Sequence, residues 1–228
     1  MIKHTTKFLA LGSLLCFLSP ADNLLAADMP ERIQAATEIL DQKQNSPNPI
    51  PIEIRNNAKA IAVFSVTKAG LGIGGRGGEG LIVVRLGDAY SHTWSAPSAF
   101  NLGGPSIGAQ VGFSESRYIV ILNTDEAVRH FTSAGKMMWD ASASGTAGTD
   151  TATEKASTSD LQKRDVIVYK DADGLFGGAT LGGTSIERKD EINQKAYGTD
   201  VLMGNILNGT VQTPKSADRL YLLLNKNA

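Results

Sequence analysis

The chain has 228 residues and a formal net charge of −1, with 22 Lys and Arg against 23 Asp and Glu. This balance excludes a nucleic-acid protein that relies on an overall basic surface. The single cysteine, Cys16, excludes a disulfide framework. The length fits one domain with a single core.

The first 27 residues have the pattern of a secretory signal peptide. Lys3 and Lys7 precede an apolar run over residues 8–18, and small residues follow at 19–21 and 25–27. The apolar run is too short for a membrane-spanning anchor. We expect cleavage after Ala27, with the site after Ala21 as the alternative. The exported chain would be periplasmic or associated with the cell envelope.

A lipoprotein interpretation of Cys16 is not favoured, because the bulky Leu15 directly before it does not suit lipoprotein processing. Removal of residues 1–27 leaves a chain without cysteine and with a net charge of about −2. This chain, residues 28–228, would have no thiolate nucleophile and no cysteine metal site.

Helical patterns open the mature chain. Residues 30–45 predict a helix, with Pro30 in its first turn and Ile33, Ala36, Ile39 and Leu40 on one side. Three prolines between residues 47 and 51 end it. A second short helix is expected over residues 52–59.

A β pattern follows, with a strand or buried run at 60–64 and continuous β character over 70–123. Seven of the eleven residues at 70–80 are glycine. Such a cluster inside strands indicates that another backbone approaches closely. Gly87 and Asp88 separate residues 81–86 from 89–94, which predicts a hairpin.

The second half of the chain alternates short strands and helices. Asn123 or Thr124 can cap a helix over 125–133. The remaining expected elements are an edge strand and loop at 136–150, a strand at 164–169, a returning Gly-rich strand at 175–186, and helices at 190–197, 201–207 and 217–224. The predicted fold is α+β: a mainly antiparallel, Gly-rich sheet or barrel-like core with short flanking helices at both ends.

Two motifs invite a catalytic interpretation that their surroundings contradict. Gly-x-Gly-x-x-Gly occurs twice within residues 70–80, but a dinucleotide site needs a helix after the glycines, and a β-branched run follows instead. Ser65 and Lys68 fit Ser-x-x-Lys, but the accompanying motifs of penicillin-recognising enzymes do not follow.

Ser106 fits the Gly-x-Ser-x-Gly nucleophile elbow, and Asp125 and His130 follow in the order acid, then histidine. The elbow requires a strand, a turn and a helix, whereas the residues after Ser106 alternate like a strand. A serine hydrolase using Ser106 is therefore a remote alternative, and we predict no catalytic residue. His92 and His130 are the only histidines after residue 27, so we predict no metal site and no cofactor.

An ordered series of motifs runs from about residue 30 to residue 224. It comprises Ala60-Ile-Ala-Val-Phe64, Lys68-Ala-Gly70, the glycine cluster at 74–80, Val84-Arg85, Trp94-Ser-x-Pro97, Gly108-x-Gln-x-Gly112, Gly135-Lys136, Gly174-Leu-Phe-x-Gly178, Leu181-x-Gly183, Asn193 and Tyr197-Gly198. In this order the motifs resemble the SYLF-domain family.

The resemblance implies a non-catalytic domain. Eukaryotic members of the family bind phosphoinositide membranes, helped by an N-terminal amphipathic segment, and some bind and bundle actin. Bacterial members are exported proteins or lipoproteins whose role is largely unassigned. The chain resembles a bacterial, single-domain member, so actin is not an expected partner.

Three features depart from the lipid-binding pattern. Ser65 stands where a proline usually follows the Ala-Val-Phe run, and residues 148–150 replace a segment that usually carries an arginine. The helix at 30–45 mixes three acidic residues with Arg32 and Lys43, whereas a helix that lies on anionic lipid normally has a Lys/Arg-rich polar face.

We therefore expect a non-catalytic lipid- or membrane-binding protein of the bacterial envelope, with anionic lipid as the ligand class. Lys68, Arg76 and Arg85 are the candidate head-group contacts, because Lys and Arg bind phosphate. The alternative is an envelope structural or protein-interaction module. Its candidate surface is formed by three residues expected to be exposed: Trp94, Pro97 and Phe100.

Overall fold

The computed structural model describes residues 27–88, 91–133, 135–139, 157–172, 175–178 and 183–226. The predicted signal peptide, Cys16 and the departure at residues 148–150 lie outside these ranges. The elements are, in order, α1 (Met29–Gln44), α2 (Ile52–Asn57), β1 (Ala60–Leu86), β2 (Thr93–Trp94), β3 (Ser98–Leu122), α3 (Asp125–Thr132), β4 (Lys136–Trp139), α5 (Thr158–Gln162), β5 (Val166–Ala172), β6 (Leu175–Gly178), β7 (Thr184–Arg188), α6 (Asp190–Tyr197), α7 (Met203–Leu207), the 3-10 turn η1 (Lys215–Ala217) and α8 (Asp218–Leu224).

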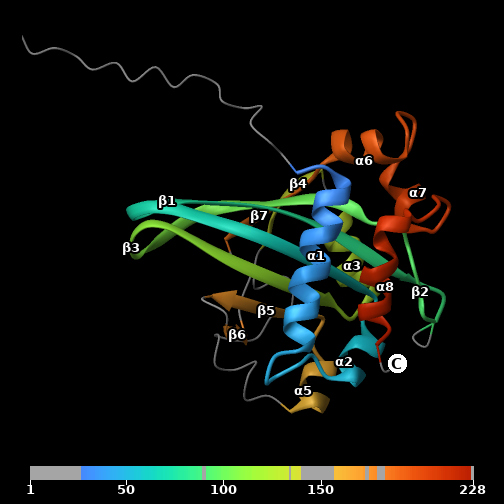
Figure 1. Cartoon of the computed structure of the whole chain (residues 1–228), viewed down its shortest axis with the longest axis horizontal. Helices are drawn as coiled ribbons and strands as arrows, with labels where there is room; N and C mark the ends of the chain where they lie inside the picture. Colours follow the sequence, from blue (N-terminus) through green and yellow to red (C-terminus); the bar gives the residue numbers. More distant parts are fainter. Residues whose placement is uncertain are drawn as a thin grey trace, which may run out of the picture.

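The described strands form one antiparallel sheet in the order β2-β1-β3-β5-β6, with β7 paired to both β3 and β4. β1 and β3 pair along almost their whole length, and they extend away from the helices before turning back (Figure 1). The predicted α+β, mainly antiparallel fold is confirmed. Of the two expected forms, the described strands make an open sheet, not a closed barrel.

β1 doubles back on itself, so that its second half runs beside its first half in the opposite direction. At the end far from the bend, where the two termini of β1 meet, the Arg85 amide donates to the Lys59 carbonyl oxygen at 2.8 Å. Further along, Gly80 lies so close to the first half that a methyl group on it would be 2.1 Å from the Val63 carbonyl oxygen. The β1–β3 register shifts at the bend, between residues 71 and 73. The predicted close approach of backbones at the glycine cluster is therefore confirmed.

The two faces of the sheet carry separate apolar clusters, because side chains alternate along each strand. One face packs against α1, α2, α5 and α8, and includes Ile61 and Val63 of β1. The other face packs against α3 and α7, and includes Phe64 of β1 and Phe131 of α3. The sheet thus lies between two layers of helices, with α1 and α8 side by side on one of them (Figure 1).

The helix predictions are largely confirmed, with small shifts at the ends. α1 begins at Met29, where Asp28 and Glu31 form a capping box, and α2 ends at Asn57. Thr124 caps α3 by accepting from the Ala127 amide. Along the described chain, η1 and α8 together occupy the predicted C-terminal helix.

Two strand predictions need correction. The strand expected over residues 175–186 is two strands: β6 pairs with β5, whereas β7 pairs with β3 and β4. The predicted hairpin exists, and Gly87 turns it with a φ of 88°. Its second strand is confined to Thr93 and Trp94 within the described residues, because the chain then leaves β1 to enter β3.

Candidate functional site

Arg85, predicted to contact a lipid head group, is buried inside the protein. It is 7% exposed, and its guanidinium donates to the carbonyl oxygens of Ala58 at 2.9 Å, Arg55 at 2.7 Å and Ser91. The group also stacks on Trp94, with 4.2 Å between Cζ and the ring centroid. Burial lowers the pKa of Arg85, although an arginine keeps its charge in a protein. Its donors serve the fold by satisfying buried carbonyl groups.

Lys68 and Arg76 lie elsewhere, on the part of β1 nearer the bend. Both are half-buried, and Nη2 of Arg76 donates to Oγ1 of Thr184 at 2.7 Å, which ties β1 to β7. The close contacts of Gly74 and Gly78 with residues 65–70 place the main chain at Arg76 near that of residues 67–68. Arg85 lies apart from both, near the C-terminal end of β1.

Trp94, Pro97 and Phe100 are buried, so the prediction that they form an exposed interaction surface is wrong. Phe100 is 0% exposed, and its ring centroid lies 5.7 Å from that of Phe131 in the core. The physical reason is that this segment enters β3, whose two faces are both covered by helices. A large apolar residue in such a strand packs inward, not toward solvent.

Ser106 lies within β3, opposite Gly74 of β1. It is not on a strand-turn-helix elbow, so the geometry that a serine hydrolase needs is absent at this position. Among the described residues, no group of three His, Cys, Asp or Glu side chains is placed to hold a metal ion.

The buried residues near Arg85 fix the end of the C-terminal helix. Nη1 of Arg55 donates to the carbonyl oxygens of Lys226 at 2.7 Å and Leu223 at 3.3 Å. A cation at this end also complements the helix dipole, and burial lowers the pKa of Arg55. Nε1 of Trp94 donates to Oδ1 of Asn225 at 3.0 Å. Trp94, which was predicted to lie on an exposed interaction surface, instead helps to hold the end of α8 in place.

The outward side of η1 and α8 is the candidate site, which we call the α8 stripe. It consists of Lys215, Arg219, Leu222 and Lys226, all of them exposed. Arg219 and Leu222, three residues apart, lie on one face of α8, whereas Lys215 precedes them in η1 and Lys226 follows the C-cap residue of α8. Leu222 is 71% exposed, whereas the opposite side is buried. That buried side carries Ala217, Leu220, Leu223 and Leu224.

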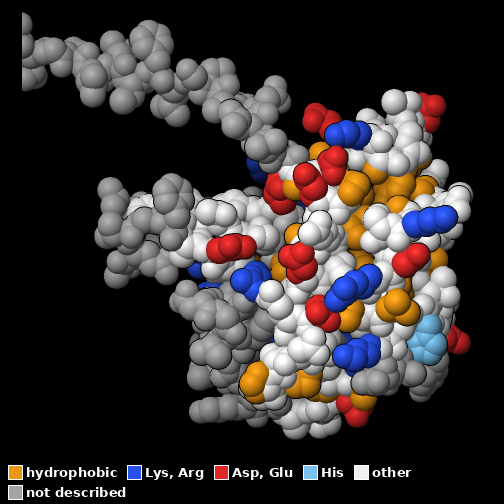
Figure 2. Space-filling view, in the orientation of Figure 1, with side chains coloured by type: hydrophobic (Ala, Val, Ile, Leu, Met, Phe, Trp, Pro, Cys, Tyr) orange, Lys and Arg blue, Asp and Glu red, His pale blue; other side chains and the backbone are white. Residues whose placement is uncertain are grey.

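Acidic residues border the α8 stripe. Arg219 pairs with Asp41 of α1 at 3.5 Å, and the Arg219 side chain is 71% exposed. Asp218 is exposed beside it. Figure 2 shows Lys, Arg, Asp and Glu side chains interspersed with hydrophobic patches over this face of the molecule. The stripe therefore combines an exposed apolar side chain with a modest excess of positive charge.

A recess of about 480 Å³ adjoins the stripe, between α1 and η1–α8. Seven residues line it, and all but the first are polar or charged: Pro30, Gln34, Thr37, Glu38, Asp41, Ser216 and Arg219. These side chains can form hydrogen bonds and ion pairs with a polar segment, whereas small-molecule pockets are lined predominantly by hydrophobic and aromatic residues.

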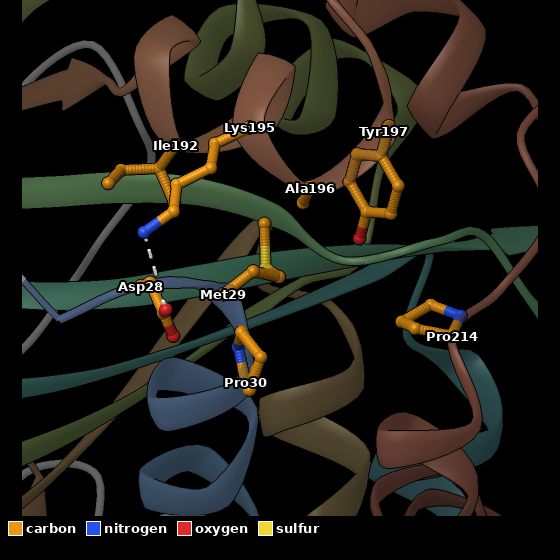
Figure 3. A pocket seen from close by; sticks show the side chains of 8 residues that line it. All are labelled: Asp28, Met29, Pro30, Ile192, Lys195, Ala196, Tyr197 and Pro214. Atoms are coloured by element: carbon orange, nitrogen blue, oxygen red, sulfur yellow. Dashed lines mark hydrogen bonds and ion pairs between the residues drawn. The ribbon is translucent and has the colours of Figure 1, made fainter.

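A smaller recess of about 230 Å³ lies at the start of α1. Lys195 extends from α6 toward Asp28, and their ion pair spans 3.5 Å (Figure 3). The remaining lining is Met29, Pro30, Ile192, Ala196, Tyr197 and Pro214. The hydroxyl of Tyr197 donates to the Pro97 carbonyl oxygen, and burial raises the Tyr197 pKa. The phenol is thus a structural donor.

The C-terminal helix was predicted from the sequence, but the α8 stripe was not. The signal was present in the spacing of Lys215, Arg219, Leu222 and Lys226. Within the described part of the chain, none of the helices is both long and apolar enough to span a bilayer.

Comparison with known proteins identifies the family. The family described as Ysc84, "Las17-binding protein actin regulator", matches residues 103–227. The chain is 38% identical over 183 residues to Protein YSC84 of Saccharomyces cerevisiae, covering 78% of this chain and 38% of that protein. It is 35% identical over 181 residues to LAS seventeen-binding protein 3 of the same yeast, covering 78% and 39%.

A human protein, SH3 domain-containing YSC84-like protein 1, is 31% identical over 209 residues, covering 89% of this chain and 60% of its own length. The chain thus spans less than two thirds of each of these relatives. No solved structure matches it. The family description names regulation of actin and no catalytic activity. On the motif series, the α+β fold and these matches, the chain belongs to the Ysc84 family of SYLF-domain proteins.

Proposed function

We propose that the protein binds anionic lipid surfaces weakly and reversibly in an exported, periplasmic setting, and that the α8 stripe is the contact. The supporting observation is Leu222, which is 71% exposed on α8, with Arg219 on the same helix and exposed Lys215 and Lys226 just before and after it. An exposed apolar residue among Lys and Arg suits a membrane interface, where it enters the head-group layer while the cations meet phosphate.

The expected strength follows from these residues. Each Lys or Arg near an anionic surface contributes about 1 kcal/mol, and burial of one leucine contributes roughly 2 kcal/mol. Asp41 and Asp218 reduce the electrostatic part. A total of about 4 kcal/mol corresponds to a Kd near 1 mM, so the binding would be weak and would fall with added salt.

Buried basic residues support the α8 stripe over α1 as the contact. Arg32 and Lys43 of α1 are each 2% exposed, and Arg32 donates to main-chain carbonyl oxygens in the core. The charged groups of Arg32 and Lys43 cannot reach a lipid surface unless this part of the protein unfolds. Lys68 and Arg76 stay a prediction for head-group contact, as a second basic site on β1.

Co-sedimentation with vesicles tests the proposal. The protein is expected to sediment with phosphatidylglycerol vesicles at low salt, less at roughly 0.15 M salt, and least with phosphatidylcholine vesicles. Leu222→Ser is expected to lower the affinity about tenfold, because it removes most of the apolar contribution. Leu202→Ser is the matched control, since Leu202 is also 71% exposed but lies outside the stripe.

Removal of an acidic residue beside the α8 stripe is expected to raise the affinity for anionic vesicles, whereas Leu222→Ser lowers it. Asp41→Asn removes the partner of Arg219 and is expected to raise affinity for anionic vesicles about threefold, because about 0.5–1 kcal/mol of local repulsion from lipid disappears. Arg219→Gln is expected to lower it by a similar factor. Equal binding by the parent, Leu222→Ser and Arg219→Gln proteins would remove the α8 stripe from the proposal.

A protein-interaction role is the second candidate, and the relatives' names favour it. One yeast relative is named LAS seventeen-binding protein 3, and the family description reads "Las17-binding protein actin regulator". In this chain the polar recess between α1 and η1–α8 is the surface that suits a peptide segment. Retention of a reproducible envelope partner by the parent, and its loss with Glu38→Lys, would support this role. A pull-down without such a partner counts against it.

A further inference from the structure

The smaller recess, at the start of α1, combines apolar walls with one pair of opposite charges. Met29 lies between the ion pair of Lys195 and Asp28 on one side and the ring of Tyr197 on the other (Figure 3). Apart from the ion pair, every lining side chain is apolar or aromatic. Mostly apolar walls with a few placed polar groups are typical of a small-molecule site.

The ion pair is loose enough for a ligand to replace it. Nζ of Lys195 lies 3.5 Å from Oδ2 of Asp28, and the two side chains are 71% and 38% exposed. Pairs between exposed side chains contribute little to stability. Asp28 and Glu31 also form the capping box of α1, so amides of the first turn are already occupied. The carboxylate oxygen that faces Lys195 is therefore the anionic contact for a ligand.

Two opposite charges side by side match a zwitterion. The ammonium group of an α-amino acid would replace Lys195 as the partner of Oδ2 of Asp28, and its carboxylate would accept from Nζ of Lys195. All four charges would then be paired. A ligand with a single charge would instead leave either Lys195 or Asp28 without its partner.

The walls and the size of the recess select the side chain of the ligand. Its volume is about 230 Å³, and because a water molecule occupies about 30 Å³ in the liquid, it has room for roughly seven or eight groups of that size. The hydroxyl of Tyr197 donates to the Pro97 carbonyl oxygen at 2.7 Å. A polar ligand side chain would therefore lose water without gaining a donor from this phenol, whereas a branched aliphatic one would contact Met29 and Ile192.

We propose that the smaller recess binds a free α-amino acid with an aliphatic side chain of about the size of leucine. The inference does not rest on lipid binding, because the recess lies between the start of α1 and α6, apart from the α8 stripe. Pro30, Lys195 and Ala196 are exposed, so the ligand would stay partly in water. Binding would be weak and exchange fast.

Titration with L-leucine, followed by NMR of the main-chain amides, tests the ligand class. The amides of residues 28–29 and 192–197 are expected to shift. N-acetyl-leucine lacks the ammonium group and leucinamide lacks the carboxylate, so each is expected to bind about tenfold more weakly. L-alanine is expected to bind at least about tenfold more weakly, since it lacks most of the apolar contact. These two derivatives also imitate the two ends of a peptide, so equal binding by either would overturn the proposal of a free amino acid.

Variants of α6 and of the ion pair test the location. Ala196→Leu fills the recess and is expected to abolish the shifts. Gln194→Leu is the matched control, because Gln194 is also exposed on α6 but does not line the recess. Asp28→Asn keeps a good helix cap and is expected to weaken L-leucine about tenfold, without weakening N-acetyl-leucine. Absence of shifts with the parent protein, or the same shifts with Ala196→Leu, would overturn the proposal.

Discussion

Gly80→Ala is expected to lower the free energy of unfolding by about 3 kcal/mol or more, the upper part of the range for overpacked sites. A methyl group at this position would lie 2.1 Å from the Val63 carbonyl oxygen and 2.5 Å from Cδ1 of Phe64. The carbonyl belongs to the doubled strand and Phe64 is fully buried, so neither can withdraw cheaply. The two halves of β1 would have to separate.

Denaturant unfolding measures this effect, with a melting temperature lower by about 10 °C as the parallel observation. Gly77→Ala is the matched control, because a methyl group there would meet nothing within 4 Å. It is expected to change stability by less than about 1 kcal/mol. If the two variants were equally stable, close approach of the backbones could not be the reason for the glycines.

This glycine cluster illustrates what the sequence could predict. Seven glycines among eleven residues need a structural explanation. The strand pattern after them excludes a phosphate-binding loop, which leaves close packing of backbones as the explanation. The α+β class and most helices followed from local periodicity and caps. These properties depend on residues near one another in the chain, which is why they could be predicted.

Which basic side chains are buried, and what they contact, could not be predicted in this way. Arg85 and Lys68 are both basic residues on one strand, yet Arg85 points among main-chain carbonyls from residues 55, 58 and 91. That environment is created by the path of the chain after α2 and after β1. Trp94 is buried for the same reason, since it packs under Arg85 and holds Asn225 from the far end of the chain.

Arg85→Met is expected to destabilise the protein by about 3 kcal/mol, because it removes the charged donor of several buried carbonyl groups at once. Methionine keeps much of the side-chain volume but leaves the Ala58 carbonyl group without its guanidinium donor and the Arg55 carbonyl group with only the Ala58 amide. A buried acceptor left without a partner costs about 1–3 kcal/mol. The stacking on Trp94 is lost as well.

The same variant separates a structural role from a lipid-binding one. Below its melting temperature, folded Arg85→Met protein is expected to bind anionic vesicles as the parent does, because the guanidinium faces carbonyl groups inside the fold. Arg85→Lys should recover less than half of the lost stability, since one ammonium group cannot reproduce the fork of donors. Lys163→Met is the control for removing a positive charge, because the Lys163 side chain is 77% exposed and lies outside both proposed lipid sites. If folded Arg85→Met lost vesicle binding while Lys163→Met kept it, Arg85 would again be a candidate lipid contact.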